Sequence, residues 1–137
     1  MAEFDADFVN TINLPGRIGV LATADADGKP NAAYFGSPRL NEDGQLVMGM
    51  MENHSLANLE ANPYAVFFTV KEAPVGFNTP GWRLYLECKQ IDREGELLAQ
   101  VKQAIASAVG EDAAAGIKAG VLFEVTRVRP LVDMSKG

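Results

Sequence analysis

The chain has 137 residues, of which 47% are hydrophobic and 22% are charged, and its formal net charge is −6. This length and composition favour one folded domain, residues 1–137, over a disordered chain. No strongly basic block occurs, which disfavours nucleic acid and anionic membranes as partners. The one cysteine, Cys88, excludes an internal disulfide, and we expect a buried, inert thiol in a reducing cytoplasm. We expect neither a signal peptide nor a membrane span.

The first part of the chain predicts a short helix followed by hairpins. Apolar residues at helical spacing predict an amphipathic helix over residues 3–13, which ends at Pro15-Gly16. Two Asp-Gly pairs then divide the chain, and this dipeptide tolerates the positive φ angles of tight hairpins. The pattern predicts a three-stranded meander with strands at residues 17–23, 31–40 and 45–51. Pro38 lacks an amide N–H, so it should lie at an edge, a bulge or a strand end.

The middle of the chain predicts a helix between strands. Residues 54–61 predict a short helix that ends at Asn62-Pro63, because the residue before proline is pushed out of the α region. The uncharged segment 64–70 is rich in β-branched and aromatic residues, as in a strand buried on both faces. Residues 82–91 alternate between apolar and polar side chains, which predicts a half-buried strand.

The end of the chain predicts one long helix and a last strand. An apolar stripe marks the helix, formed by Leu97, Leu98, Val101, Ile105 and Ala108. Gly110 should cap it, and a strand should follow over residues 121–132. Six strands joined mostly by hairpins predict a mainly β protein, an antiparallel barrel or sheet with helices packed outside. Strands and helices do not alternate regularly, so a doubly wound nucleotide-binding fold is disfavoured.

The polar junction at residues 49–58 is the main candidate for a ligand site. The first amides of a helix have no partner within the helix, and the backbone dipole adds positive charge there, which suits a phosphate. His54 adds charge or an N–H donor, and the small Gly49 would let a ligand approach the strand closely. Asn53 and Ser55 are also good N-caps, and capping alone accounts for both residues. These residues by themselves leave capping and anion binding open.

Other chemistry finds less support in the sequence. His54 is the only histidine, and adjacent side chains at a helix start make a poor catalytic dyad, so a serine hydrolase is disfavoured. One histidine and one cysteine supply too few ligands for a metal site, and we expect none. The chain lacks a nucleophile elbow, a Walker A motif and a G-x-G-x-x-G motif.

The order of several short motifs points to a family. These motifs are Ala22-Thr23, Asp27-Gly28-Lys29-Pro30, Asn53-His54-Ser55 and Asn62-Pro63, followed by "GWRLYLECKQI" and a long helix. Across residues 14–130 the chain resembles the pyridoxamine 5′-phosphate oxidase-like FMN-binding split-barrel family. The resemblance implies a six-stranded antiparallel split β-barrel with short flanking helices. It also implies a homodimer with FMN at the subunit interface.

The resemblance also implies a set of cofactor-binding residues. By similarity, His54 takes the cationic position at the FMN phosphate, and Ser55 takes a hydroxyl or second basic position. Neighbouring strand residues would lie along the flavin ring or ribityl chain. The full expected set is Met50, Met51, Asn53, His54, Ser55, Asn58, Tyr34, Phe35, Ser37 and Arg83. No residue is assigned a catalytic role.

The chain departs from the oxidase at several positions. Alanines stand at 32 and 33, and no arginine or lysine occurs at residues 53–55, where the oxidase has basic residues. The chain also lacks the C-terminal extension that completes the vitamin site, so we do not expect the true oxidase reaction. We expect an FMN flavoprotein that exchanges electrons or hydride with a small substrate. The alternative is a non-catalytic module of the same fold that holds haem or another flavin-type cofactor.

Overall fold

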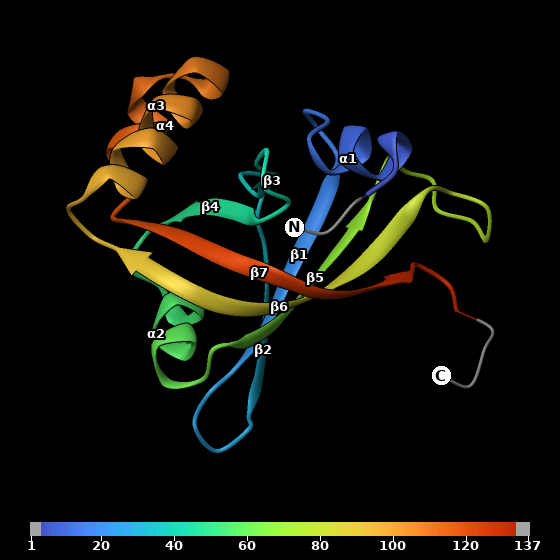
Figure 1. The fold of residues 1–137 in the computed structure, drawn as a ribbon, viewed down its shortest axis with the longest axis horizontal. Helices are drawn as coiled ribbons and strands as arrows, with labels where there is room; N and C mark the ends of the chain where they lie inside the picture. Colours follow the sequence, from blue (N-terminus) through green and yellow to red (C-terminus); the bar gives the residue numbers. More distant parts are fainter. Residues whose placement is uncertain (1–3, 134–137) are drawn as a thin grey trace.

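The computed structural model describes residues 4–133, and within this range one antiparallel sheet curls into a half-barrel (Figure 1). Its strands are β1 (Ile18–Ala24), β2 (Pro30–Tyr34), β3 (Arg39–Leu40), β4 (Leu46–Met50), β5 (Tyr64–Val70), β6 (Gly81–Asp92) and β7 (Ala119–Pro130). The helices are α1 (Ala6–Ile12), α2 (His54–Ala61), α3 (Glu96–Val109) and α4 (Glu111–Ala115). The strand order is β2-β1-β5-β6-β7-β4-β3. The mainly β fold with short flanking helices is confirmed.

The predicted meander is wrong in one respect. The expected strand at 31–40 is two strands, because β2 ends at Tyr34 and β3 begins at Arg39. Pro38 lies in the gap between them, where no ladder hydrogen bond needs its missing amide. β4 pairs with β7 rather than with β2, so the hairpins β1-β2 and β3-β4 lie at opposite edges of the sheet. The described sheet therefore has seven strands instead of six.

Residues 35–38 carry the chain from one edge of the sheet to the other and so draw the half-barrel together. The Phe35 amide still donates to the Gly19 carbonyl on β1, over 3.0 Å. Two residues later the Ser37 hydroxyl has reached β4, where it lies 3.2 Å from the Gly49 carbonyl and 3.3 Å from the Gly49 amide. This crossover explains how two edge strands can be consecutive in the sequence.

A buried arginine holds the crossover in place. Arg17 is 2% exposed, and its guanidinium donates to four backbone carbonyls, those of Ile12, Phe35, Gly36 and Pro38. It also lies 5.0 Å from the centre of the Phe67 ring. Burial lowers the pKa of Arg17. Since a buried charge is costly unless its donors are satisfied, this contact set fixes both the end of α1 and residues 35–38.

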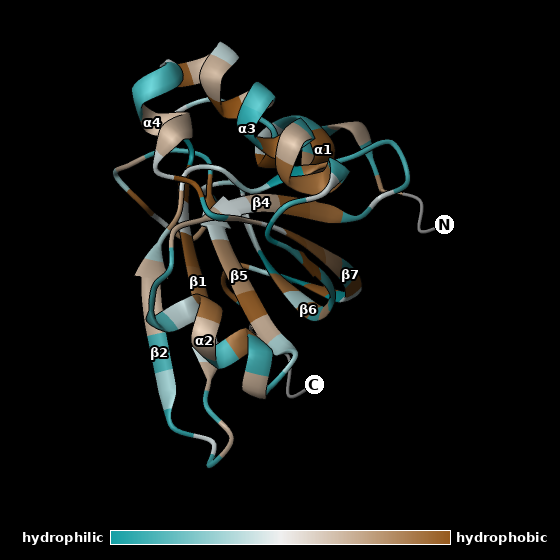
Figure 2. Cartoon of the chain, turned by 90° about the vertical axis from the view of Figure 1, so that its left-hand side faces the viewer, coloured by the Kyte–Doolittle hydropathy of each residue, from teal (hydrophilic) through white to brown (hydrophobic). Residues whose placement is uncertain are grey.

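The core fills the inside of the curled sheet. Its largest side chains include Leu21, Phe67, Leu84 and Phe123 from the strands, with Ile12 from α1 and Leu56 from α2. In Figure 2 hydrophobic residues run along β1 and β5, while the β1-β2 turn is hydrophilic. β5 is not buried on both faces as predicted, because Tyr64 is 64% exposed and Phe68 is 39% exposed.

The helices follow local signals closely in most places. α2 and β5 have the predicted bounds, and α1 begins at Ala6 rather than at residue 3, which lies outside the described range. α3 packs outside the sheet against β4 and β7, with Val101 of its predicted stripe buried and Ala108 exposed. The short α4 was not predicted. Within residues 4–133, no helix is both long and apolar enough to cross a membrane.

Candidate functional site

The start of α2 has the geometry of a capped helix with two leading amides. The Asn53 side chain accepts a hydrogen bond from the Leu56 amide at 2.8 Å. The first backbone bond of the helix runs from the Ala57 amide to the Asn53 carbonyl, at 3.2 Å. The amides of His54 and Ser55 precede that bond, so they have no partner within the helix. Capping by Asn53 is confirmed, and the dipole of α2 adds positive charge at the same place.

The side chains at this start differ sharply in exposure. His54 lies exposed on the surface, whereas Ser55 is 2% exposed. Asn58 is 4% exposed, and its Nδ2 donates to Thr23 Oγ1 on β1 at 3.0 Å. The amide nitrogen of Asn58 therefore already serves the fold. His54 is the polar side chain of this group that a ligand in solvent can reach without rearrangement.

The two methionines before the helix point in different directions. The side chain of Met50 belongs to the core at 1% exposure, so Met50 can meet a ligand only through its backbone. Its carbonyl accepts a hydrogen bond from the Lys118 amide at 2.8 Å. Met51 is 56% exposed, and its sulfur lies beside Gly116.

Gly49 does not leave room for a ligand, although its small size had suggested that a ligand could approach the strand there. A β-carbon at Gly49 would lie 2.8–2.9 Å from side-chain atoms of Val101, Ile105 and Ile117. These residues come from α3 and the segment after α4. Gly49 therefore lets the helical layer pack closely against β4.

An ion-pair cluster beside α2 was missed by the sequence interpretation. Arg93, just after β6, contacts Glu52 through Nε at 3.1 Å and through Nη2 at 3.0 Å. The same guanidinium contacts Glu60, in the last turn of α2, at 2.9 and 3.5 Å. The pairing lowers the pKa of Glu52 and raises that of Arg93. The partners are 41 and 33 residues apart in sequence, so no local pattern could have revealed them.

The outward side chains of the sheet form rows across neighbouring strands, and we call this surface the outer face. The strand register gives one row as Tyr34, Val20, Phe68, Arg83 and Arg129. A second row is Ala32, Ala22, Val66, Tyr85 and Arg127. A third is Tyr64, Glu87 and Glu124. The first two rows therefore end in arginines on β7, and the third ends in two glutamates. Lys89 pairs with both glutamates at 3.2 and 3.5 Å, and Arg129 pairs with Asp133 at 2.7 Å.

The expected residues Tyr34 and Arg83 share one of these rows. Tyr34 is 63% exposed, and Arg83 donates from Nε to the Pro130 carbonyl at 3.1 Å. Three strand spacings separate them, which is about 14 Å. The row places both side chains on the outer face without bringing them into contact.

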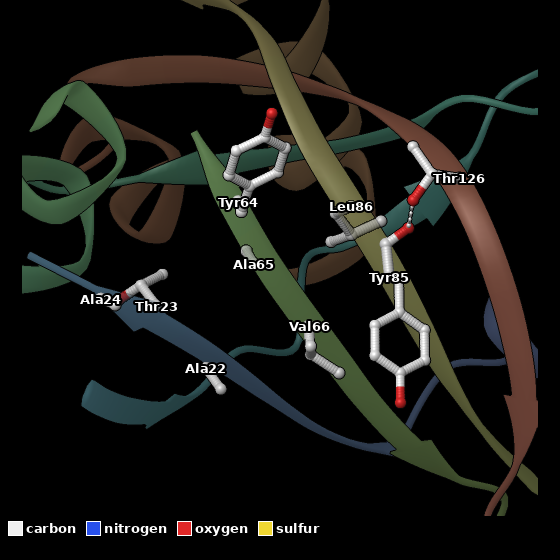
Figure 3. Close-up of a pocket in the computed structure, with 9 residues that line it drawn as sticks. All are labelled: Ala22, Thr23, Ala24, Tyr64, Ala65, Val66, Tyr85, Leu86 and Thr126. Carbon is white, nitrogen blue, oxygen red and sulfur yellow. Dashed lines mark hydrogen bonds between the residues drawn. The ribbon is translucent and has the colours of Figure 1, made fainter. Parts of the chain in front are cut away.

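A shallow hollow of about 410 Å³ lies in the middle of the outer face (Figure 3). Small side chains on β1, Ala22 and Ala24, form one side of it. Tyr64 and Tyr85 come from β5 and β6, and the Thr126 hydroxyl donates to the Tyr85 carbonyl at 3.2 Å. The lining is apolar and holds none of the ten cofactor residues expected from the sequence.

Within one chain the expected residues do not form a single pocket. Those at the start of α2 lie on the inner side of the sheet, because Leu56 enters the core and Asn58 contacts the inward Thr23. Tyr34 and Arg83 lie on the outer face. Phe35 and Ser37 belong to the crossover, where Phe35 packs against the core and the Ser37 hydroxyl contacts β4.

The curled antiparallel sheet with its flanking helices defines a split-barrel protein, and sequence comparison agrees. The profile of the pyridoxamine 5′-phosphate oxidase family matches residues 8–131, so the chain belongs to this family. Among curated proteins, none matches the chain by sequence.

Solved structures share the fold at low sequence identity. An FMN-binding protein from Syntrophomonas wolfei has a TM-score of 0.80 and 19% identity, covering 93% of this chain and 85% of that one. HupZ from Group A Streptococcus has a TM-score of 0.76 and 22% identity, covering 94% of both chains. HutZ, a haem storage protein from Vibrio cholerae, has a TM-score of 0.59 and 24% identity, covering 85% and 82%. These likenesses show the fold and no more.

Proposed function

We propose that this protein is an FMN-binding flavoprotein whose start of α2 receives the phosphate. The observation that carries the proposal is the exposed His54 beside two leading amides of α2, in a chain of the oxidase family. Leading helix amides suit a phosphate, and a protonated imidazole adds an opposite charge. The fold likeness to an FMN-binding protein supports the same cofactor.

The residues at the start of α2 fit the phosphate end of FMN, mainly through backbone amides and with few side-chain contacts. The amides of His54 and Ser55 and the His54 ring would hold the phosphate, and Met51 would offer an exposed apolar contact. Asn53 and Asn58 would act indirectly, because their side chains already bond to Leu56 and Thr23. Bound FMN would supply the redox chemistry, and the chain would orient it toward a small electron or hydride acceptor or donor.

The proposal includes a homodimer with the flavin between the subunits. The start of α2 and the outer face lie on different sides of the sheet, so one chain cannot bring both to one ligand. Tyr34 or Arg83 would reach the flavin of the α2 site only from a second subunit. The exposed aromatic side chains Tyr34, Tyr64 and Phe68 favour such an association. A cytoplasmic location stays a prediction that rests on cysteine usage.

Ligand titration tests the phosphate site directly. The absorbance spectrum of the purified protein shows whether flavin is bound, and fluorescence quenching then measures affinity for FMN and riboflavin. His54→Ala should weaken FMN more than riboflavin, whereas His54→Lys should retain or strengthen FMN binding. Gln103→Ala, at an exposed position on α3, is the matched control. A protein that quenches neither flavin would overturn the FMN proposal.

A haem protein is the second candidate, and one observation favours it. The start of α2 carries Glu52 but no arginine or lysine at 53–55, and the exposed His54 could instead ligate iron. The fold likeness to a haem storage protein is in keeping with this alternative. Haem titration should then shift and sharpen the Soret band of free haem, and His54→Ala should abolish this change, while FMN and riboflavin bind equally weakly.

A further inference from the structure

Arg93 joins the two ends of α2 through carboxylates. Glu52 precedes the helix by two residues, and Glu60 lies in its last turn. The guanidinium contacts both, with shortest distances of 3.0 Å to Glu52 and 2.9 Å to Glu60. The Glu52 contact uses two nitrogens and two oxygens, which fixes the orientation of that carboxylate. One side chain just after β6 thus contacts both the segment entering α2 and the last turn of the helix.

The charge of Glu52 matters because of its place in the chain. It stands two residues before His54, in the segment that enters the start of α2. An unpaired carboxylate there would repel a phosphate, and residues 53–55 supply no permanent cation to offset it. The side-chain hydrogen bonds from Arg93 lower the pKa of Glu52, so this carboxylate is ionised and only a cation can offset its charge. Arg93 is the cation in contact with it, and Arg93 shares its single charge with Glu60.

We propose that Arg93 is a positioning residue of the α2 site: it holds the Glu52 carboxylate in an ion pair, which allows a phosphate to bind at the start of α2. This inference rests on the proposed FMN function and extends it to a residue that does not touch the ligand.

A double-mutant cycle with two flavins tests the proposal. The proteins are wild type, Arg93→Gln, Glu52→Gln and the double variant, with Arg39→Gln as control. Arg39 is an exposed arginine on β3, far from α2 in Figure 1. At low ionic strength Arg93→Gln should weaken FMN about three- to tenfold and leave riboflavin unchanged, as expected for one exposed charge acting on a phosphate. The double variant should recover FMN affinity, because removing Glu52 removes the repulsion.

The outcomes separate an electrostatic role from a structural one. The proposal would be overturned if Arg93→Gln weakened FMN and riboflavin equally or left FMN affinity unchanged. It would also be overturned if the double variant did not recover FMN affinity. High salt should shrink the effect of Arg93→Gln on FMN, and an effect that does not depend on salt would also count against it.

The positioning role of Arg93 can also be tested without a ligand, in case the flavin proposal fails. If wild-type protein binds neither flavin, the FMN function is wrong, and amide hydrogen exchange then decides whether Arg93 positions α2. Arg93→Gln should speed exchange at the Leu56 and Ala57 amides, which bond to Asn53, relative to Arg39→Gln. Unchanged exchange would mean that Arg93 does not hold this segment.

Discussion

Asn58 shows how a residue that resembles a ligand contact can serve the fold. Its side chain crosses from α2 to β1 and donates to the Thr23 hydroxyl, which is also buried. The two residues are 35 positions apart, and neither stands in a pattern that indicates the pair. A polar residue on a short helix near a proposed phosphate site therefore has two distinct explanations, which mutation can separate.

Asn58→Ala should lower the free energy of unfolding by about 1–3 kcal/mol, because it leaves the buried Thr23 hydroxyl without this partner. Urea denaturation measures the change, and Asn10→Ala, at an exposed position on α1, is the control. Thr23→Val should show coupling to Asn58→Ala in a double-mutant cycle. Unchanged stability together with lost FMN binding would instead identify Asn58 as a direct ligand.

Individual site residues were predictable only where local signals decide them. The Asn53 cap and the junction position of His54 follow from residue type and from the strand-to-helix change. The burial of Met50 and the exposure of Met51 depend on how β4 packs in the sheet. The engagement of Ser37 with β4 depends on the crossover between the sheet edges, which no short pattern encodes.

At the scale of elements, α3 is capped from outside its own first turn. Gly95 has no side chain to cap the helix, and the Asp92 carboxylate accepts from the amides of Gly95 at 2.7 Å and Leu98 at 3.1 Å. A β-carbon at Gly95 would lie 2.7 Å from that carboxylate, so the glycine makes the cap possible. These backbone hydrogen bonds lower the pKa of Asp92.

Asp92→Ala should lower the thermal midpoint, and the difference from wild type should depend on pH. The pKa of Asp92 is lowered from 3.8, so its stabilisation is fully present above that pH and is lost as pH falls through the lower folded value. Circular dichroism melts of both proteins from neutral to acidic pH measure this. Glu72→Ala, an exposed loop carboxylate, controls for net charge. A difference that persists undiminished at the acid end would contradict capping by the ionised carboxylate.

Gly49→Ala should destabilise the protein by about 1–3 kcal/mol, as overpacking typically does. The added methyl group would meet Val101 and Ile105 of α3 at under 3 Å. Gly76→Ala, where a β-carbon meets nothing within 4 Å, is the matched control in chemical denaturation. If Gly49→Ala kept full stability but lost flavin affinity, the original interpretation of Gly49 as a ligand approach would be restored.

Element bounds were most predictable where the chain itself supplies a stop signal. Asn62-Pro63 separates α2 from β5, and both elements have the predicted bounds. The division of 31–40 into two strands follows instead from pairing, since β2 lies beside β1 while β3 lies beside β4. Hairpin signals indicate which strands are connected, but the placement of each hairpin in the sheet is a long-range outcome.

At the scale of the whole molecule, the outer face is the surface that we propose for contact with a second copy. Arg83 and Arg129 lie in one end row, and Glu87 and Glu124 lie in the opposite row, with the apolar hollow between them. A twofold axis along the middle row would bring the arginine row of one copy over the glutamate row of the other. Within each chain Lys89 already pairs with both glutamates, and Asp133 already pairs with Arg129, so the apolar middle would contribute more to this contact than the charges do. The same contact would cover the exposed aromatic side chains. The outer face is therefore a specific surface for association that can be tested separately from the shared flavin site.

Val66→Asp, at the centre of that face, should convert a wild-type dimer into a folded monomer, because the interface would bury an unpaired charge. Light scattering after size exclusion measures the mass, and Val75→Asp, on an exposed loop residue, is the control. Affinity for FMN and for riboflavin should stay unchanged in this monomer, because the start of α2 lies on the other side of the sheet from the outer face. A wild-type monomer that binds FMN at one site per chain would contradict both the interface and the shared site. If Val66→Asp remained a dimer, the interface would lie on another surface. The α2 site would then be tested only by the flavin titrations of the His54 variants.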